Sequence, residues 1–101
     1  MKFFIDTEFI EYPCTIDLAS IGIVSEDNDQ LYLESSECDW SKANSWVLKN
    51  VKPKMQNIGI PRYQIKRKIY KFIKDRCRVP EFWGYYSDYD WVVFLLDLWR
   101  Y

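Results

Sequence analysis

The chain has 101 residues, enough for one domain with a real core, since 49% of them are hydrophobic and 19% aromatic. The net charge of −1 excludes a protein that coats nucleic acid through overall positive charge, so a polyanionic substrate would need bound cations and a local basic patch. The chain contains no histidine, which excludes Ser-His-Asp and Cys-His catalysis and the usual zinc sites.

Cysteine spacing and the N-terminal sequence bear on the compartment. Cys14, Cys38 and Cys77 are irregularly spaced without a C-x-x-C pair, which fits neither a disulfide framework nor a zinc knuckle. The first residues do not form a secretory signal, and no stretch approaches the length of a membrane span. We therefore expect a soluble, cytoplasmic protein in a reducing compartment, without a membrane partner.

Three strands are predicted to open the fold. Residues 2–10 form the first and residues 15–25 the second, in which Gly22 allows a bulge or a close approach. Residues 30–34 follow a polar turn and should pair back as a hairpin.

Helical character follows. Asp39 or Ser41 is expected to cap a first helix that ends at Pro53. Pro61 suits the first turn of a second helix. Apolar residues recur along that second helix with helical spacing: Tyr63, Ile65, Ile69, Tyr70, Phe72 and Ile73. Cations lie between them: Lys66, Arg67, Lys68, Lys71 and Lys74. These cations form either a solvated helix face or a flank for a phosphate backbone.

The C-terminal part is predicted to contain one more strand and one more helix. Residues 81–86 read as a short aromatic strand and residues 89–101 as a third helix. The order is βββ-α-α-β-α, which indicates a single mixed α/β domain over residues 1–101.

Two acids on the first strand are the main functional signal. Side chains alternate between the faces of a strand, so Asp6 and Glu8 should lie together on one face. Two carboxylates this close repel unless a cation or strong donors lie between them. Solvation on a half-exposed strand is the simplest alternative, but the flanking sequence is apolar enough for a central strand. We therefore expect a metal site.

Asp90 is the candidate for a third acid. It follows the aromatic strand, and ligands bind at the carboxyl ends of parallel strands. If that strand lies parallel to the first and next to it, Asp90 can approach Asp6 and Glu8. Three carboxylates form an oxygen-only site suited to Mg²⁺ or Mn²⁺. Alternatively, Asp90 is an N-terminal helix acid that interacts with the macrodipole.

The sequence FIDTEFIE at residues 4–11 resembles the first motif of the DEDD-type (DnaQ-like) 3′–5′ exonucleases. It is most similar to the small bacterial and phage exoribonuclease branch that opens with DTEFIE. Residues 16–24 resemble the second strand of that branch, residues 45–47 and 51–54 its first helix, and residues 83–90 its second motif. The resemblance extends over essentially the whole chain.

This resemblance implies an RNase H-like fold and two-metal hydrolysis of RNA from its 3′ end. It implies that Asp6 bridges both metals, that Glu8 binds the ion that activates water, and that Asp90 holds the second ion. The expected partner is a single-stranded RNA or a nucleotide monophosphate. The alternative function is a non-catalytic RNA- or nucleotide-binding module on the same fold.

The family has a third motif, which supplies a fourth acid and a His or Tyr general base. No residue of this chain can be assigned to it, so we expect the chain to be C-terminally truncated relative to the family. Three explanations stay open: a shortened relative of an active enzyme, a segment supplied by a second chain, or a module that no longer cuts.

Aromatic residues near the acids have two interpretations. Core packing is the default for Trp83, Tyr85 and Tyr86. Stacking of a terminal base by Tyr86 or Phe9 is the alternative. Our expected substrate contacts are Thr7, Phe9 and Tyr86. Apolar residues of the last predicted helix exceed what a small sheet can bury, which predicts a homo-oligomer, most simply a dimer.

Overall fold

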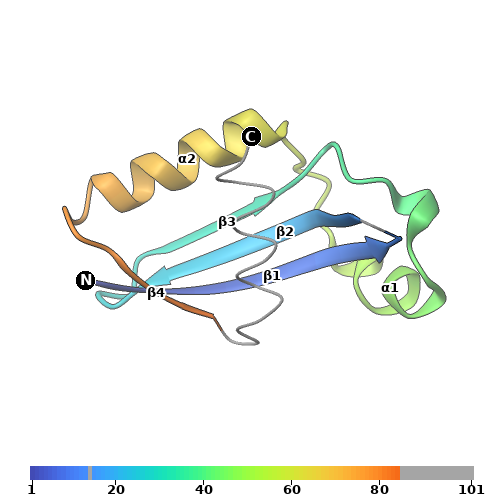
Figure 1. Cartoon of the computed structure of the whole chain (residues 1–101), viewed down its shortest axis with the longest axis horizontal. Coiled ribbons are helices and arrows are strands. Elements are labelled where there is room, and N and C mark those ends of the chain that lie inside the picture. Colours follow the sequence, from blue (N-terminus) through green and yellow to red (C-terminus); the bar gives the residue numbers. More distant parts are fainter. Residues whose placement is uncertain (14, 85–101) are drawn as a thin grey trace.

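The computed structural model describes residues 1–13 and 15–84, which form a mixed α/β arrangement with one four-stranded sheet (Figure 1). The strands are β1 (Lys2–Tyr12), β2 (Thr15–Ser25), β3 (Gln30–Glu34) and β4 (Glu81–Gly84), in the order β3-β2-β1-β4. The three predicted N-terminal strands are therefore confirmed, with β1 two residues longer than expected.

The register of β1 fixes where its side chains lie. β1 pairs antiparallel with β2, and the pairing shifts between Glu8, opposite Ser20, and Phe9, opposite Leu18. Ala19 is thus the extra residue of a bulge in β2. β4 pairs parallel with β1 and brings Gly84 opposite Ile5, one residue before Asp6.

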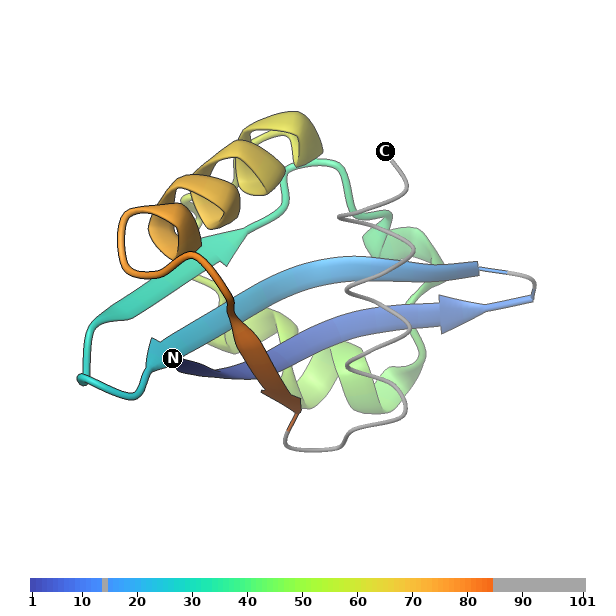
Figure 2. The same cartoon turned by 60° about the vertical axis from the view of Figure 1, so that its left-hand side comes forward.

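One face of the sheet is covered by α2 (Arg62–Lys74), as Figure 2 shows. Alternate residues of β1 point toward this helix, so Phe3 and Ile5 are buried. Among residues 1–13 and 15–84, the main core contains ten buried residues: Phe3, Ile5, Leu18, Ile21, Ile23, Leu33, Ile65, Ile69, Phe72 and Ile73. The predicted helical spacing of the apolar residues is confirmed for the four members that α2 supplies.

Within the described residues, α1 (Ser45–Asn50) and its flanking turns cover the opposite face near the end of β1 (Figure 1). Ile10 of β1 packs there with Val47 and Val51. The short helices η1 (Trp40–Lys42) and η2 (Lys52–Lys54) precede and follow α1. The rest of this face, toward the start of β1, carries Phe4, Asp6 and Glu8, which are exposed.

The predicted start of the first helix is wrong. Asn44 caps α1 by accepting a hydrogen bond from the Val47 backbone N–H at 2.9 Å. Asp39 instead caps η1 through the Ser41 N–H at 3.0 Å. The backbone is extended at Ala43, between the two helices, so neither Asp39 nor Ser41 can cap α1.

The end of α1 and the start of α2 also differ by a few residues from expectation. Pro53 lies inside η2 and does not itself end α1. Pro61 is the residue before α2 and not a residue of its first turn. Carboxylates hold this end of α2: Glu37 accepts from the Arg62 N–H at 2.8 Å, and the Asp17 Oδ1 lies 2.6 Å from the Arg62 Nη2. Asp17 is only 2% exposed, so this ion pair fixes α2 to β2.

Several expected features fall outside the described residues. They are the end of the aromatic strand at residues 85–86 and the helix expected over residues 89–101. Among the helices of residues 1–13 and 15–84, none has the length and apolarity that a membrane span requires.

Candidate functional site

Asp6 and Glu8 lie on the face of the sheet that α2 does not cover. Alternation along β1 places both side chains there, and both are exposed. They line one pocket of about 220 Å³, which we call the acid pocket. The sequence prediction that the two carboxylates share one face is confirmed. The remaining lining residues come from the sheet and from the region of α1 and η2: Ser20, Gly22, Tyr32, Asn50, Val51, Lys54 and Met55.

The β2 side of the pocket is formed by the cross-strand partners of the acids. Ser20 lies opposite Glu8, and Gly22 lies opposite Asp6. A Cβ on Gly22 would have its nearest neighbour, the Asp6 carbonyl oxygen, at 3.9 Å, which is an ordinary contact. The sequence predicted either a bulge or a close backbone approach at Gly22. The bulge occurs at Ala19 instead, and the backbone around Gly22 leaves enough room for a Cβ. The small size of Gly22 leaves open space beside Asp6.

A buried carboxylate supports the opposite wall of the pocket. Glu34 is 1% exposed and accepts hydrogen bonds from the Tyr32 hydroxyl at 2.5 Å, the Gln56 N–H at 2.8 Å and the Ile58 N–H at 3.3 Å. Burial alone would raise the pKa of Glu34, but these donors outweigh it and the pKa lies below its usual value. Glu34 therefore anchors the loop that follows Met55 to β3.

Tyr32 lines the pocket, and its hydroxyl group donates a hydrogen bond to Glu34. Desolvation, followed by its hydrogen bond to Glu34, raises the pKa of Tyr32 to about 12, and the negative charge of Glu8 acts in the same direction. The hydroxyl group is therefore protonated at neutral pH and cannot serve as an anionic base. Its one proton is donated to Glu34, so toward the pocket the Tyr32 oxygen can only accept a hydrogen bond, for example from a water molecule near Glu8.

Sequence reasoning missed Tyr32, Glu34 and Lys54. The signal for Tyr32 was its position in the third strand, since it pairs with Gly22, which in turn pairs with Asp6. Lys54 and Asn50 come from helical segments whose position over the sheet the sequence does not reveal. Lys54 brings a positive charge to the wall of a pocket whose other charged lining residues are acids.

An apolar cavity of about 470 Å³ adjoins the acid pocket. Phe4, Val24 and Trp83 supply its hydrophobic lining, and Asp6 and Gly22 line both cavities. The side chains of Phe4 and Trp83 are 46% and 48% exposed, so their rings are accessible next to Asp6. This surface suits a flat, apolar group adjacent to the carboxylates.

The predicted substrate contacts on β1 lie elsewhere. Thr7 is buried, and Phe9 is half-buried against the core formed with α2. Their side chains alternate with those of Asp6 and Glu8 and so belong to the opposite face of β1. Any contact of Thr7 or Phe9 with a ligand in the acid pocket would therefore run through the backbone, and their role stays a prediction.

The third acid and the third substrate contact, Asp90 and Tyr86, lie outside the described residues. Among residues 1–13 and 15–84, no group of three or more Asp, Glu, His or Cys side chains could hold a metal ion. The prediction for Asp90 required the aromatic strand to lie next to the first strand and parallel to it, and β4 pairs with β1 in this way. The role of Asp90 stays a prediction.

Comparison with known proteins shows a sequence similarity to named exoribonucleases. No family model matches the chain. The chain is 39% identical over 104 aligned residues to two proteins named 3′–5′ exoribonuclease, from Mycobacterium tuberculosis strains CDC 1551 and H37Rv. Each alignment covers 98% of this chain and 61% of the relative. The chain thus spans about three fifths of the length of these curated relatives.

Proposed function

We propose that this chain hydrolyses RNA from its 3′ end in a reaction that depends on Mg²⁺ or Mn²⁺, and that its fold is the RNase H-like fold of DEDD exonucleases. The observation that carries the proposal is the pair Asp6 and Glu8, exposed on one face of β1 in a single pocket. The similarity to two proteins named 3′–5′ exoribonuclease supports the same reaction.

The donor atoms of the acid pocket fit a hard divalent cation. Besides the two carboxylates, the pocket is lined by the hydroxyls of Ser20 and Tyr32 and the amide of Asn50. Oxygen donors of this kind are the ligands that Mg²⁺ and Mn²⁺ prefer. Asp6 and Glu8 would hold the ions together with Asp90. Bound there, divalent ions would lower the pKa of a water molecule and neutralise phosphate charge.

Residues around the acids have distinct tasks in this proposal. The Lys54 ammonium contacts a non-bridging phosphate oxygen of the substrate, and the Tyr32 hydroxyl, whose proton is donated to Glu34, accepts a hydrogen bond from a water molecule near Glu8. The rings of Phe4 and Trp83 receive the terminal base in the adjoining apolar cavity. Phosphoryl transfer of this type depends mainly on positioning and charge neutralisation, which this set of residues supplies.

A labelled RNA tests the reaction and its direction. A 5′-labelled single-stranded RNA is incubated with the chain and Mn²⁺, with a parallel sample in EDTA. The proposal predicts a ladder of progressively shorter labelled products that EDTA abolishes. Asp6→Asn and Glu8→Gln should each lower the rate by at least about a hundredfold, since the carboxylates act as a unit.

Glu11→Gln is the matched control, because Glu11 is an exposed acid on the same strand that does not line the pocket. Its rate should equal that of the wild type. Immediate release of the labelled nucleotide would indicate the opposite polarity and contradict the proposal. Binding of RNA without shortening would instead identify a non-catalytic RNA-binding module.

A further inference from the structure

The positive charge of the chain is concentrated in one segment. Residues 62–78, which comprise α2 and the turn after it, carry eight of the 14 Lys and Arg residues and one of the 15 Asp and Glu residues. α2 lies on the face of the sheet opposite to α1 (Figure 2), and the acid pocket lies on the side of α1, which contributes Asn50 to its lining. A protein with a net charge of −1 thus has a strongly basic surface on one side.

Exposed aromatic and cationic side chains share one stripe of α2. The members recur every three or four residues and therefore lie on one side of the helix. Tyr63 and Tyr70 are 59% and 55% exposed, and the cations between and after them are also exposed. We call the following set the α2 stripe: Tyr63, Arg67, Tyr70, Lys71 and Lys74. From Tyr63 to Lys74 it extends about 16 Å, at about 1.5 Å per residue.

The cations of the α2 stripe have no carboxylate partner in the part of the chain that the structure describes. Within the described residues, Arg67, Lys71 and Lys74 form no ion pair with an acid, whereas Arg62 and Arg76 in the same segment pair with Asp17 and Asp29. Like charges three or four residues apart destabilise a helix by roughly 0.2–0.5 kcal/mol per pair. A helix face that is only solvated would ordinarily contain acids among its cations. A bound polyanion would relieve the repulsion between these like charges.

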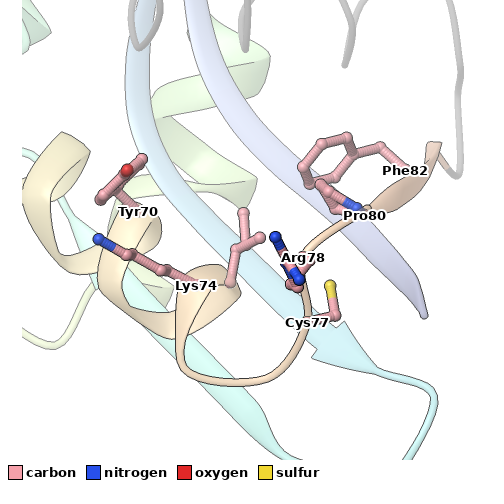
Figure 3. Close-up of a pocket in the computed structure, with 7 residues that line it drawn as sticks. Tyr70, Lys74, Cys77, Arg78, Pro80 and Phe82 are labelled. Carbon is pink, nitrogen blue, oxygen red and sulfur yellow. The ribbon is translucent and has the colours of Figure 1, made fainter.

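A cavity of about 420 Å³ continues the stripe beyond the end of α2. Figure 3 shows Tyr70 and Lys74 of α2 on one side of this cavity and Phe82 of β4 on the other. Arg78 adds a second cation to the lining, and Ile73 and Pro80 add apolar surface. The Lys74 Nζ lies 5.5 Å from the centroid of the Tyr70 ring. Cations beside apolar and aromatic surface match the phosphate and the base of a nucleotide.

From these features we propose that the α2 stripe and the cavity at its C-terminal end bind single-stranded RNA. Arg67, Lys71, Lys74 and Arg78 contact phosphates, and Tyr63 and Tyr70 stack on bases. A single strand is favoured over a duplex because only unpaired bases can stack on exposed rings. An anionic membrane is a poorer ligand, because the apolar face of α2 is buried in the core and cannot insert into lipid.

This binding site is separate from the acid pocket and does not depend on hydrolysis. It is therefore tested by binding alone, in EDTA, with a fluorescent single-stranded oligoribonucleotide and anisotropy as the readout. The variant is Lys71→Gln with Lys74→Gln. Each phosphate contact of a single strand contributes about 0.7 to the slope of log K against log salt. The double variant should bind more weakly and show a slope smaller in magnitude by about 1.4.

The matched control is Lys42→Gln with Lys49→Gln, which removes two exposed cations outside α2 and changes the net charge equally. Its binding and salt slope should equal those of the wild type. Circular dichroism verifies that both double variants are folded. An equal loss in the two double variants would show only general electrostatics and overturn the proposal, as would unchanged binding of the Lys71 and Lys74 variant.

Stacking is tested by Tyr70→Ala, with Trp46→Ala as the control on α1, where Trp46 is 64% exposed. Tyr70→Ala should weaken RNA binding roughly tenfold, and Trp46→Ala should not change it. Vesicles that contain an anionic phospholipid provide the last comparison. Binding to these vesicles that depends on Lys71 and Lys74, with no RNA binding, would assign the surface to membranes and overturn the proposal.

Discussion

Glu34 shows how one buried residue shapes a site that it does not line. Its carboxylate holds the Tyr32 hydroxyl on one side and backbone N–H groups of the loop after Met55 on the other. A buried carboxylate is stable only when its oxygens accept enough hydrogen bonds, and here they do. Glu34 thereby sets the position of two walls of the acid pocket relative to each other.

Replacement of Glu34 by Gln should destabilise the fold at neutral pH by about 2 kcal/mol, because charge-assisted hydrogen bonds are lost. The pKa of Glu34 is lowered in the folded state, so its stabilisation is present above the pKa of the unfolded chain. It is lost as pH falls through the lower, folded-state pKa. Urea unfolding of both proteins should therefore show a difference that shrinks in acid. A constant difference at all pH values would contradict the ionised role of Glu34.

Tyr32 offers a test of how a hydroxyl group contributes to the acid pocket. Under the proposed function, Tyr32→Phe should lower the rate of RNA shortening by about tenfold or more, since the acceptor that positions a water molecule near Glu8 is removed. The pKa of about 12 keeps the hydroxyl protonated, so the ratio of the two rates should be constant between neutral and mildly alkaline pH. A ratio that changes steeply with pH in that range would indicate an ionising Tyr32 and contradict the assignment.

At the scale of the elements, the connection from β3 to α2 contains one position where two backbone segments come close together. Ser35 and Ile60 form an isolated parallel bridge, and Gly59 lies directly before it. A Cβ on Gly59 would meet the Ser36 Cα and N at 3.0 Å, which forces the backbone to shift. This approach joins the end of β3 to the segment that leads into α2.

Gly59→Ala should therefore lower the free energy of unfolding by roughly 1–3 kcal/mol, the range typical of overpacking. Gly22→Ala is the control, because a Cβ there meets its nearest neighbour at 3.9 Å. Gly22→Ala should be neutral or slightly stabilising, since Ala restricts the unfolded chain more than Gly. Equal destabilisation of the two variants in a urea titration would show that backbone contact at Gly59 is unimportant.

The elements differ in how well the sequence predicts them. Strands β1, β2 and β3 were predictable because alternation and polar turns are local signals. The cap of α1 was not, since Asp39, Ser41 and Asn44 are all good cap residues and tertiary contacts choose among them. The shared face of Asp6 and Glu8 follows from strand geometry alone.

The remainder of the acid pocket was beyond prediction for a different reason. Lys54 and Asn50 reach the acids only because α1 and η2 fold over the open face of the sheet, a packing choice without a local signature. The position of Tyr32 in the pocket depends on the exact register of the hairpin formed by β2 and β3. Long-range packing and register are thus the steps at which the sequence is ambiguous.

At the scale of the whole molecule, the paired carboxylates of the acid pocket and the cations of the α2 stripe lie on opposite faces of the sheet. The carboxylates of the acid pocket suit cations, and the α2 stripe suits phosphates. An RNA-binding protein with a net charge of −1 is physically reasonable under this division, since local fields near a surface decide the attraction of a polyanion.

A dimer remains our prediction for the oligomeric state. Its basis is the apolar surface expected for residues 89–101, which lie outside the described residues. Light scattering coupled to size exclusion should give about twice the mass of 12.3 kDa. A monodisperse species at the mass of one chain, even at high concentration, would contradict the prediction.

Binding of Mn²⁺ tests the central claim most directly, because it needs neither an RNA substrate nor turnover. Electron paramagnetic resonance of free Mn²⁺ is followed as the wild-type chain, Asp6→Asn, Glu8→Gln and Glu11→Gln are added in turn. We expect the wild type and Glu11→Gln to deplete the free ion alike, and Asp6→Asn and Glu8→Gln to deplete it far less. Equal depletion by all four proteins, or none by the wild type, would contradict a divalent cation site at Asp6 and Glu8.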